Sequence, residues 1–214
     1  SSLAEERATL ERERAGMAAR TEAGAAEKLR AEGEISAAAE KLRNAESHLA
    51  GYDALWPEAF HGNGPLADAK DHVIAALKEG RAEAGELYAA LVRWHMVRAV
   101  AGKDRELWIA AADALGRASQ AFLTKEPADG ASAAEQLERA QLWTRAIKTP
   151  LEQAFPELKL NAVYAGDRFD TDRMEAVGSI SGGRQTVHRA LSWSILEKTA
   201  ESTRVVRRAQ VITA

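Results

Sequence analysis

The stretch "FDTDRMEAVGSI" (residues 169–180) differs from nearly everything that precedes it, and it decides the fold class. The preceding chain is rich in Ala, Glu, Arg and Leu at helical spacing. Here Phe169 and Asp170 lead into a turn of mixed residues, and a run with Val177 and Ile180 follows. Short β-favouring runs next to turn residues are typical of strands. The sequence therefore predicts a helical protein that ends in a small β region.

Short runs of the same kind continue to the end of the chain. They are "LKLNAVYA" (158–165), "EAVGSISGG" (175–183), "TVHRALSWSILEK" (186–198) and "TRVVRRAQVITA" (203–214). In the third run every second residue from Val187 to Ile195 is apolar except Arg189, an alternation typical of a strand. We expect about four strands in a single small sheet or flattened barrel. The Gly182–Gly183 pair lacks the spacing of a phosphate-binding loop, so it predicts a hairpin turn.

Residues 1–50 predict a long polar helix. Leu3, Leu10 and Met17 lie seven residues apart, and between residues 31 and 49 the apolar positions follow in steps of four and three. This spacing is the a/d pattern of a coiled coil. Arg7 and Arg14 occupy companion positions in the first half, so the helix needs a partner helix to be stable. A solvated helical arm with one Ala/Leu stripe is the alternative interpretation.

Residues 51–156 predict a bundle of shorter helices. "GYDALWPEAFHGNGP" (51–65) is a loop by composition, and its Trp56 and Phe60 are expected to pack onto the bundle. Apolar stripes then predict helices from Pro65 to Gly80 and over 83–101, 104–124 and 131–155. "KEPADGAS" (125–132) predicts a loop. The remaining local predictions are an Asp104 cap, a Ser132–Glu135 capping box, a kink at Pro150, and one core shared by Trp94, Trp108 and Trp143.

The expected class is thus α+β, elongated and mainly helical, with three parts: a helical arm (1–50), a helical bundle (51–156) and a small all-β domain (157–214). The chain has 214 residues, of which 46% are hydrophobic and only 6% aromatic. A core this poor in aromatic residues favours an elongated or oligomeric protein.

Composition also limits the classes of function. The net charge of −3 provides no general attraction to nucleic acid or to an anionic membrane. No apolar run approaches the length of a membrane span. Cysteine is absent, which rules out thiolate chemistry in this chain and suits a reducing cytoplasm. The five histidines show no metal-ligand spacing, and no catalytic constellation is visible. We therefore expect no enzyme activity, no cofactor and no metal.

Four arginines, Arg189, Arg204, Arg207 and Arg208, fall on predicted strands and predict a basic patch. Salt bridges across an exposed face are one interpretation of this patch. A role in binding a protein partner is the other.

The C-terminal region resembles the GrpE family of nucleotide exchange factors. Phe169, Asp170, Met174, Ala176 and Val177 fit the first half of the family's β-domain signature at the right spacing. "VRRAQV" (206–211) fits the second half, at about the separation that the family uses for its middle strands. The family places two shorter helices just before this domain, and the resemblance covers about residues 83–214. Before its last hairpin the family usually has Gly and an aromatic residue, where this chain has Lys198 and Thr199.

The resemblance implies a homodimeric co-chaperone that grips the nucleotide-binding domain of a DnaK-type chaperone and promotes ADP release. Position by position, the implied partner-binding residues are Phe169, Thr171, Ile195 and Thr213. Phe169 and Ile195 could equally belong to the core of the sheet. A structural or scaffolding protein that has kept the domain without exchange activity is the alternative.

Overall fold

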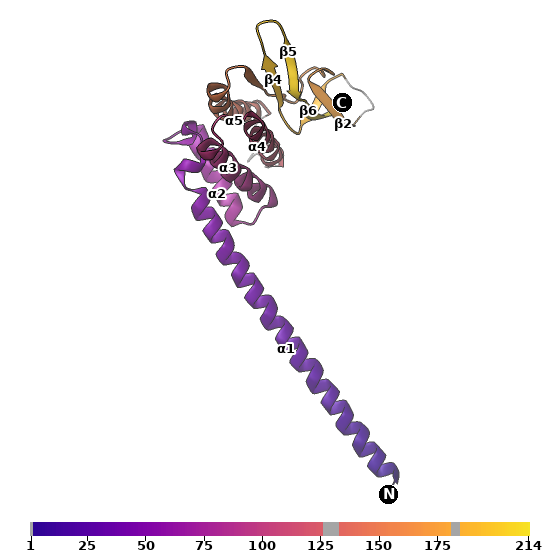
Figure 1. Ribbon diagram of the computed structural model, residues 1–214. Helices are drawn as coiled ribbons and strands as arrows, with labels where there is room; N and C mark the ends of the chain where they lie inside the picture. Colours follow the sequence, from indigo (N-terminus) through magenta and orange to yellow (C-terminus); the bar gives the residue numbers. More distant parts are fainter. Residues whose placement is uncertain (1, 126–132, 181–184) are drawn as a thin grey trace. The chain divides into compact units, whose positions relative to one another are not determined.

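The computed structural model describes residues 2–125, 133–180 and 185–214, and the chain divides into two compact units, residues 1–46 and 47–214. The first unit is purely helical. The second contains shorter helices followed by strands (Figure 1). The predicted α+β class, with a long N-terminal helix and a small C-terminal β region, is confirmed.

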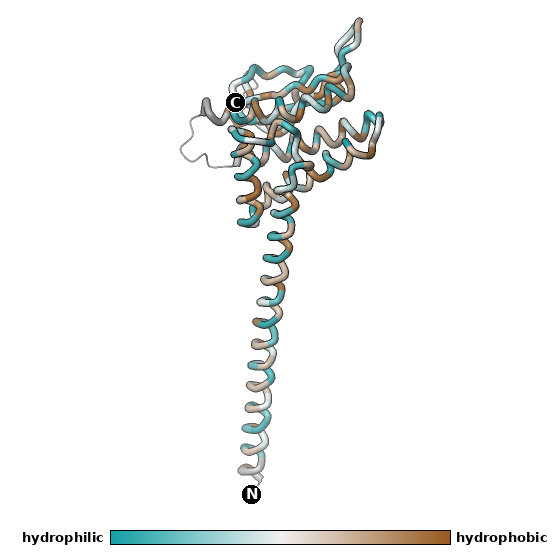
Figure 2. Tube along the Cα trace, turned by 90° about the vertical axis from the view of Figure 1, so that its left-hand side faces the viewer, coloured by the Kyte–Doolittle hydropathy of each residue, from teal (hydrophilic) through white to brown (hydrophobic). Residues whose placement is uncertain are grey.

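Helix α1 runs from Ser2 to Ala50 without interruption, as predicted. At 1.5 Å per residue it is about 70 Å long. Nearly all its residues are exposed, and hydrophilic and weakly hydrophobic residues alternate along it (Figure 2). The predicted apolar stripe is also exposed: Leu10 is 56%, Ile35 68% and Leu42 61% accessible. The stripe is therefore available to a partner helix, and the coiled coil stays a prediction.

The connection after α1 packs onto the helices as its aromatic residues predict. It contains two short 3-10 helices, η1 (Asp53–Leu55) and η2 (Glu58–Phe60). Trp56 and Phe60 are each 1% exposed. The Trp56 indole Nε1 donates to the Ala50 carbonyl at 2.6 Å, and both rings meet Trp143 edge-on. A buried indole needs such a hydrogen-bond acceptor, so this bond fixes the last turn of α1 within the second unit.

Four helices follow close to their predicted positions: α2 (Pro65–Lys78), α3 (Ala82–Val100), α4 (Arg105–Lys125) and α5 (Ala133–Ala154). The Asp104 carboxylate caps α4 by accepting the Leu107 N–H at 3.2 Å. The three tryptophans Trp94, Trp108 and Trp143 belong to one core, as expected. Pro150 lies inside α5, which continues to Ala154. The 125–132 loop, apart from Lys125 at the end of α4, and the cap at Ser132 lie outside the described residues.

The expectation of about four strands in one sheet is wrong. The described residues form six strands: β1 (Leu158–Asn161), β2 (Met174–Ser179), β3 (Val187–Ala190), β4 (Ser194–Lys198), β5 (Thr203–Arg207) and β6 (Ala209–Thr213). They build two three-stranded sheets, one in the order β1-β4-β5 and the other in the order β2-β6-β3. The predicted Gly182–Gly183 turn lies outside the described residues.

Each of the two longest runs is divided because the chain passes from one sheet to the other. Between β3 and β4 the backbone N–H groups of Leu191 and Ser192 both donate to the Gln210 carbonyl, at 2.8 and 3.3 Å. The Ser192 hydroxyl in turn accepts the Gln210 N–H at 2.8 Å. The alternation of "TVHRALSWSILEK" hides this crossing, because a side chain next to the crossing, Trp193, is buried just as a strand residue would be.

Trp193 also joins the strands to the helices. Its ring is 2% exposed and belongs to the same core as the helical tryptophans. A Cβ placed on Gly116 of α4 would lie only 2.7 Å from the Trp193 ring. Glycine at position 116 is therefore required by the close approach of the indole. The helices and the first sheet consequently pack as one body across the predicted boundary near residue 156.

This contact predicts opposite outcomes for two Gly→Ala substitutions in helices. Gly116→Ala should lower the free energy of unfolding by about 1–2 kcal/mol, because the overpacking penalty exceeds the gain in helix propensity. Gly85→Ala in α3 is the matched control, since its Cβ would meet nothing within 4 Å. That change should raise the free energy by up to about 1 kcal/mol. Urea denaturation of both variants measures the two effects, and a stabilised Gly116→Ala would contradict the packing described.

Candidate functional site

The two sequence segments that carry the family resemblance are neighbours in the structure. Strand β2 pairs in parallel with β6, with Met174 opposite Ala209 and Ala176 opposite Val211. The residues of each pair are 35 positions apart in the sequence, yet they lie on adjacent parallel strands, whose register shifts between Ala176 and Gly178. Met174, Ala209 and Val211 share a small apolar cluster of their own. Met174, Ala209 and Val211 therefore belong to the core of this second sheet, whereas Val177 is 51% exposed and Val206 lies on β5 of the other sheet.

The turn before β2 is held by Asp170. Its carboxylate accepts the Asp172 N–H at 2.9 Å, and its backbone carbonyl accepts the N–H of Met174 at 2.8 Å. Short-range bonds of this type favour Asp at turns. Phe169 is half-buried against the small apolar cluster, and Thr171 is exposed at the top of the turn. Phe169 thus anchors the turn, and Thr171 presents its side chain to solvent.

Ile195 and Thr213 do not lie on the surface, which corrects their assignment as contact residues. Ile195 is 1% exposed in β4, the central strand of its sheet. Thr213 is 0% exposed in β6, the central strand of the other sheet, and its hydroxyl donates to the Gly178 carbonyl at 3.4 Å. Alternating runs place such residues on a strand correctly. They do not show which face of the strand the helices or the second sheet will cover.

A second exposed feature is the hairpin formed by β4 and β5, which extends beyond the helices of its own unit (Figure 1). Thr199 and Ser202 close its turn. The Thr199 N–H donates to the Ser202 carbonyl at 2.8 Å, and the Thr199 hydroxyl accepts the Ser202 N–H at 3.1 Å. Lys198 and Thr199 stand where the GrpE family usually has Gly and an aromatic residue. The chain forms a hairpin here, and the hydrogen bonds between Thr199 and Ser202 close its turn.

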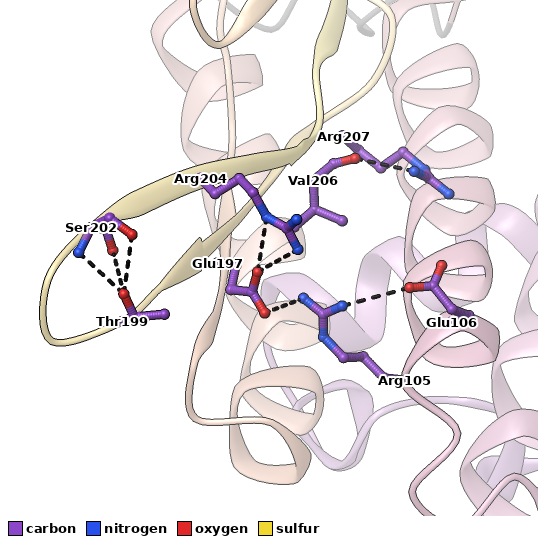
Figure 3. Close-up of polar contacts among 8 residues, drawn as sticks. All are labelled: Arg105, Glu106, Glu197, Thr199, Ser202, Arg204, Val206 and Arg207. Atoms are coloured by element: carbon purple, nitrogen blue, oxygen red, sulfur yellow. Dashed lines mark hydrogen bonds and ion pairs between the residues drawn. The ribbon is translucent and has the colours of Figure 1, made fainter.

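An ion-pair network fastens this hairpin to α4 (Figure 3). The Glu197 carboxylate receives Arg105 of α4 on one oxygen at 2.6 Å and Arg204 of β5 on the other at 2.7 Å. Arg105 is 26% and Glu197 20% exposed, whereas Arg204 is 69% exposed. The first pair is partly shielded from water, so its attraction is screened less than that of the second.

The network bears on the arginines of the predicted basic patch. Arg204 is paired with Glu197, while Arg189 lies on β3 in the other sheet. The salt-bridge interpretation thus applies to Arg204. Sequence reasoning missed Arg105 and Glu197 because 92 residues separate them and no local pattern links them.

The described residues contain no group of three or more His, Cys, Asp or Glu side chains placed to hold a metal ion. Among the helices of the described segments, none combines the length and apolarity needed to cross a membrane.

No protein-family model, curated protein or solved structure matches this chain.

The hairpin network predicts unequal coupling for its two arginines. In double-mutant cycles with Glu197→Gln, Arg105→Met should show a coupling of about 1.5 kcal/mol, because it is a charged hydrogen bond in a partly buried place. Arg204→Met should show about 0.5 kcal/mol, as exposed pairs do. Chemical denaturation of the single and double variants provides both values. Equal couplings would contradict a hairpin fastened mainly through α4.

Proposed function

We propose that this protein is a GrpE-like nucleotide exchange factor that acts on a DnaK-type chaperone in the cytoplasm. The observation that supports the proposal most directly is the parallel pairing of β2 with β6. Parts of two segments that resemble the family signature separately, residues 174–177 and 209–211, here belong to one sheet. A chance resemblance of two distant segments would not require them to be adjacent strands.

The proposed mechanism is differential binding. An exchange factor accelerates ADP release when it binds the open, nucleotide-poor chaperone more tightly than the closed one. A hundredfold preference corresponds to about 2.7 kcal/mol. The protein supplies this difference through contacts alone, without an acid, a base or a metal of its own.

Two exposed turns are suited to contact the chaperone, and each is held in place by contacts with the rest of the second unit. The Asp170 turn presents Thr171, and the β4–β5 hairpin presents Thr199 to Ser202. The hairpin is braced by Arg105, and the turn is anchored by Phe169. Bracing matters because a flexible contact would lose ordering entropy on binding and would transmit little force to the chaperone lobe.

We further propose that the protein acts as a homodimer through α1. Leu3, Leu10 and Met17 lie seven residues apart, as do Ile35, Leu42 and Leu49, and the two exposed sets occupy the d and a positions of one heptad pattern. Burying this face against a second copy would remove six large apolar side chains from water. The basic residues at companion positions in the first half make the second half the stronger part of the seam.

A substitution in the Asp170 turn tests the exchange function. In a fluorescent-ADP release assay with a DnaK-type chaperone, the native protein should accelerate release. Thr171→Arg should reduce that acceleration by about tenfold, a loss of about 1.4 kcal/mol, because a long charged side chain would obstruct the contact. Thr171 is exposed, so the fold should be unaffected.

Ser36→Arg is the matched control, since Ser36 is an exposed hydroxyl residue on α1 away from the apolar stripe. It should leave the release rate unchanged. A native protein that gives no acceleration at saturation would contradict the exchange proposal itself. Normal acceleration by Thr171→Arg would contradict only the role of the turn.

The alternative function is a structural or scaffolding protein that assembles through α1 and has no exchange activity. The burial of Ile195 and Thr213 favours it, because two of the four residues implied as contacts are inaccessible. A native protein that dimerises but does not accelerate ADP release would support this alternative.

The dimer has a test of its own in α1. Leu42→Glu should shift the protein from dimer to monomer at micromolar concentration, because it places a charge in the proposed seam. Leu29→Glu is the matched control: Leu29 is 70% exposed but lies off the stripe, so the dimer should persist. Sedimentation equilibrium of both variants measures the outcome. A monomeric native protein, or equal effects of the two changes, would contradict the proposed seam.

A further inference from the structure

A polar cleft of about 660 Å³ lies between α5 and β1, and no residue of the β4–β5 hairpin or the Asp170 turn lines it. Twelve residues line it, and only Leu160 and Ala162 among them are apolar. Apolar residues of α5 and β1, such as Leu151 and Leu158, belong to the core beneath the cleft. The polar lining of the cleft itself can contact a polar ligand but provides little apolar surface.

Glu152 organises the cleft. One carboxylate oxygen accepts the Leu160 N–H at 3.2 Å and meets the Lys148 ammonium at 3.4 Å, and the other meets the Lys159 ammonium at 3.3 Å. Glu152 is 18% exposed, whereas the two lysines are 42% and 41% exposed. The carboxylate thus bonds strand to helix and holds both lysines near one point. Each ammonium has three donors and uses one here, so donors remain for a ligand.

The lining carries more positive charge than Glu152 neutralises. Arg145, Lys148 and Lys159 are opposed by this one carboxylate, which leaves the lining with a net charge of +2 in a protein whose overall charge is −3. Arg145 is exposed, one turn before Lys148 on the same face of α5. A guanidinium beside two ammonium groups is a favourable arrangement for phosphate, which accepts paired bonds from Arg and point charges from Lys.

Tyr164 provides a neutral donor at the same cleft. Partial burial raises the pKa of its phenol, against the opposing effect of a hydrogen bond with Thr144. The phenol therefore stays protonated at neutral pH and can donate to an anion without adding negative charge.

We propose that the cleft between α5 and β1 binds a small phosphate-bearing anion, held by Arg145, Lys148 and Lys159. The inference is independent of the exchange function, because the cleft contains neither the Asp170 turn nor the hairpin. Two linked phosphates suit the lining better than one, because its cations span a turn of helix and the facing strand.

Titration calorimetry with inorganic pyrophosphate, at ionic strength held constant with sodium chloride, tests the site. We expect saturable binding with a dissociation constant of about 1 mM or tighter. Inorganic phosphate should bind more weakly, and succinate should bind more weakly than pyrophosphate. Amide chemical shifts should change along Arg145–Gln153 and Lys159–Asn161. No saturable binding, or equal binding of succinate, would overturn the proposal.

Arg145→Gln/Lys148→Gln should weaken pyrophosphate binding by at least about tenfold. The matched control is Arg98→Gln/Lys103→Gln, which removes the same charge from exposed positions outside the cleft and should leave binding unchanged. If both pairs weaken binding equally, the attraction is general and the site does not exist. If the double variant in the cleft fails to fold, Arg145→Gln alone replaces it, because Arg145 takes part in none of the ion pairs among the described residues; unchanged binding there would again overturn the proposal.

Discussion

The pairing of β6 with both β2 and β3 is the constraint on which the β region depends. β6 is the central strand of its sheet and contains residues 209–213, close to the end of the chain. β2 cannot find its parallel partner until that segment is present. Parallel pairing also requires a long connection, and here the connection contains β3, β4 and β5. The sheet β2-β6-β3 therefore cannot form before β6 is in place, and contacts this distant in sequence form slowly.

The chain crosses between the two sheets three times, between β1 and β2, between β3 and β4, and between β5 and β6. Once β6 lies between β2 and β3, strands β4 and β5 have no remaining place beside it and pair with β1 instead. The crossing before β4 is secured by Gln210, which bonds to Leu191 and Ser192, and by Trp193 packed on Gly116. The glycine in a helix and the glutamine in a strand are thus parts of one junction. This junction fixes the position of the β4–β5 hairpin relative to α4, so the exposed turn of the hairpin is held in place.

The helices could be predicted from the sequence because each depends on a local pattern. The apolar stripe of α2, the Asp104 cap and the buried Trp56 and Phe60 all follow from residues within a few turns of one another. The sequence predicted where the β region lies but not how many strands it contains. The crossing at residues 191–193 cannot be seen in the sequence, because apolar residues keep their every-second-residue spacing through it. Burial of Thr213 escaped prediction, and burial of Ile195 was only one of two interpretations, because burial depends on which distant element covers each face. The Arg105–Glu197 pair and the Glu152 cleft depend on tertiary contacts that no spacing rule describes.

Binding and bracing have different requirements, and the second unit separates them in space. Residues that must hold their position, such as Met174, Trp193 and Ile195, are buried and apolar. Residues available to another molecule are exposed in turns, namely Thr171 in the Asp170 turn and the residues of the β4–β5 hairpin turn. Buried contacts hold both turns in position. A contact surface of this kind can diverge in sequence while the supporting core is retained, because an exposed side chain contributes little to stability. The family resemblance accordingly lies mainly in strand residues, and the departures from it lie in the last hairpin, where a partner would decide which side chains are needed.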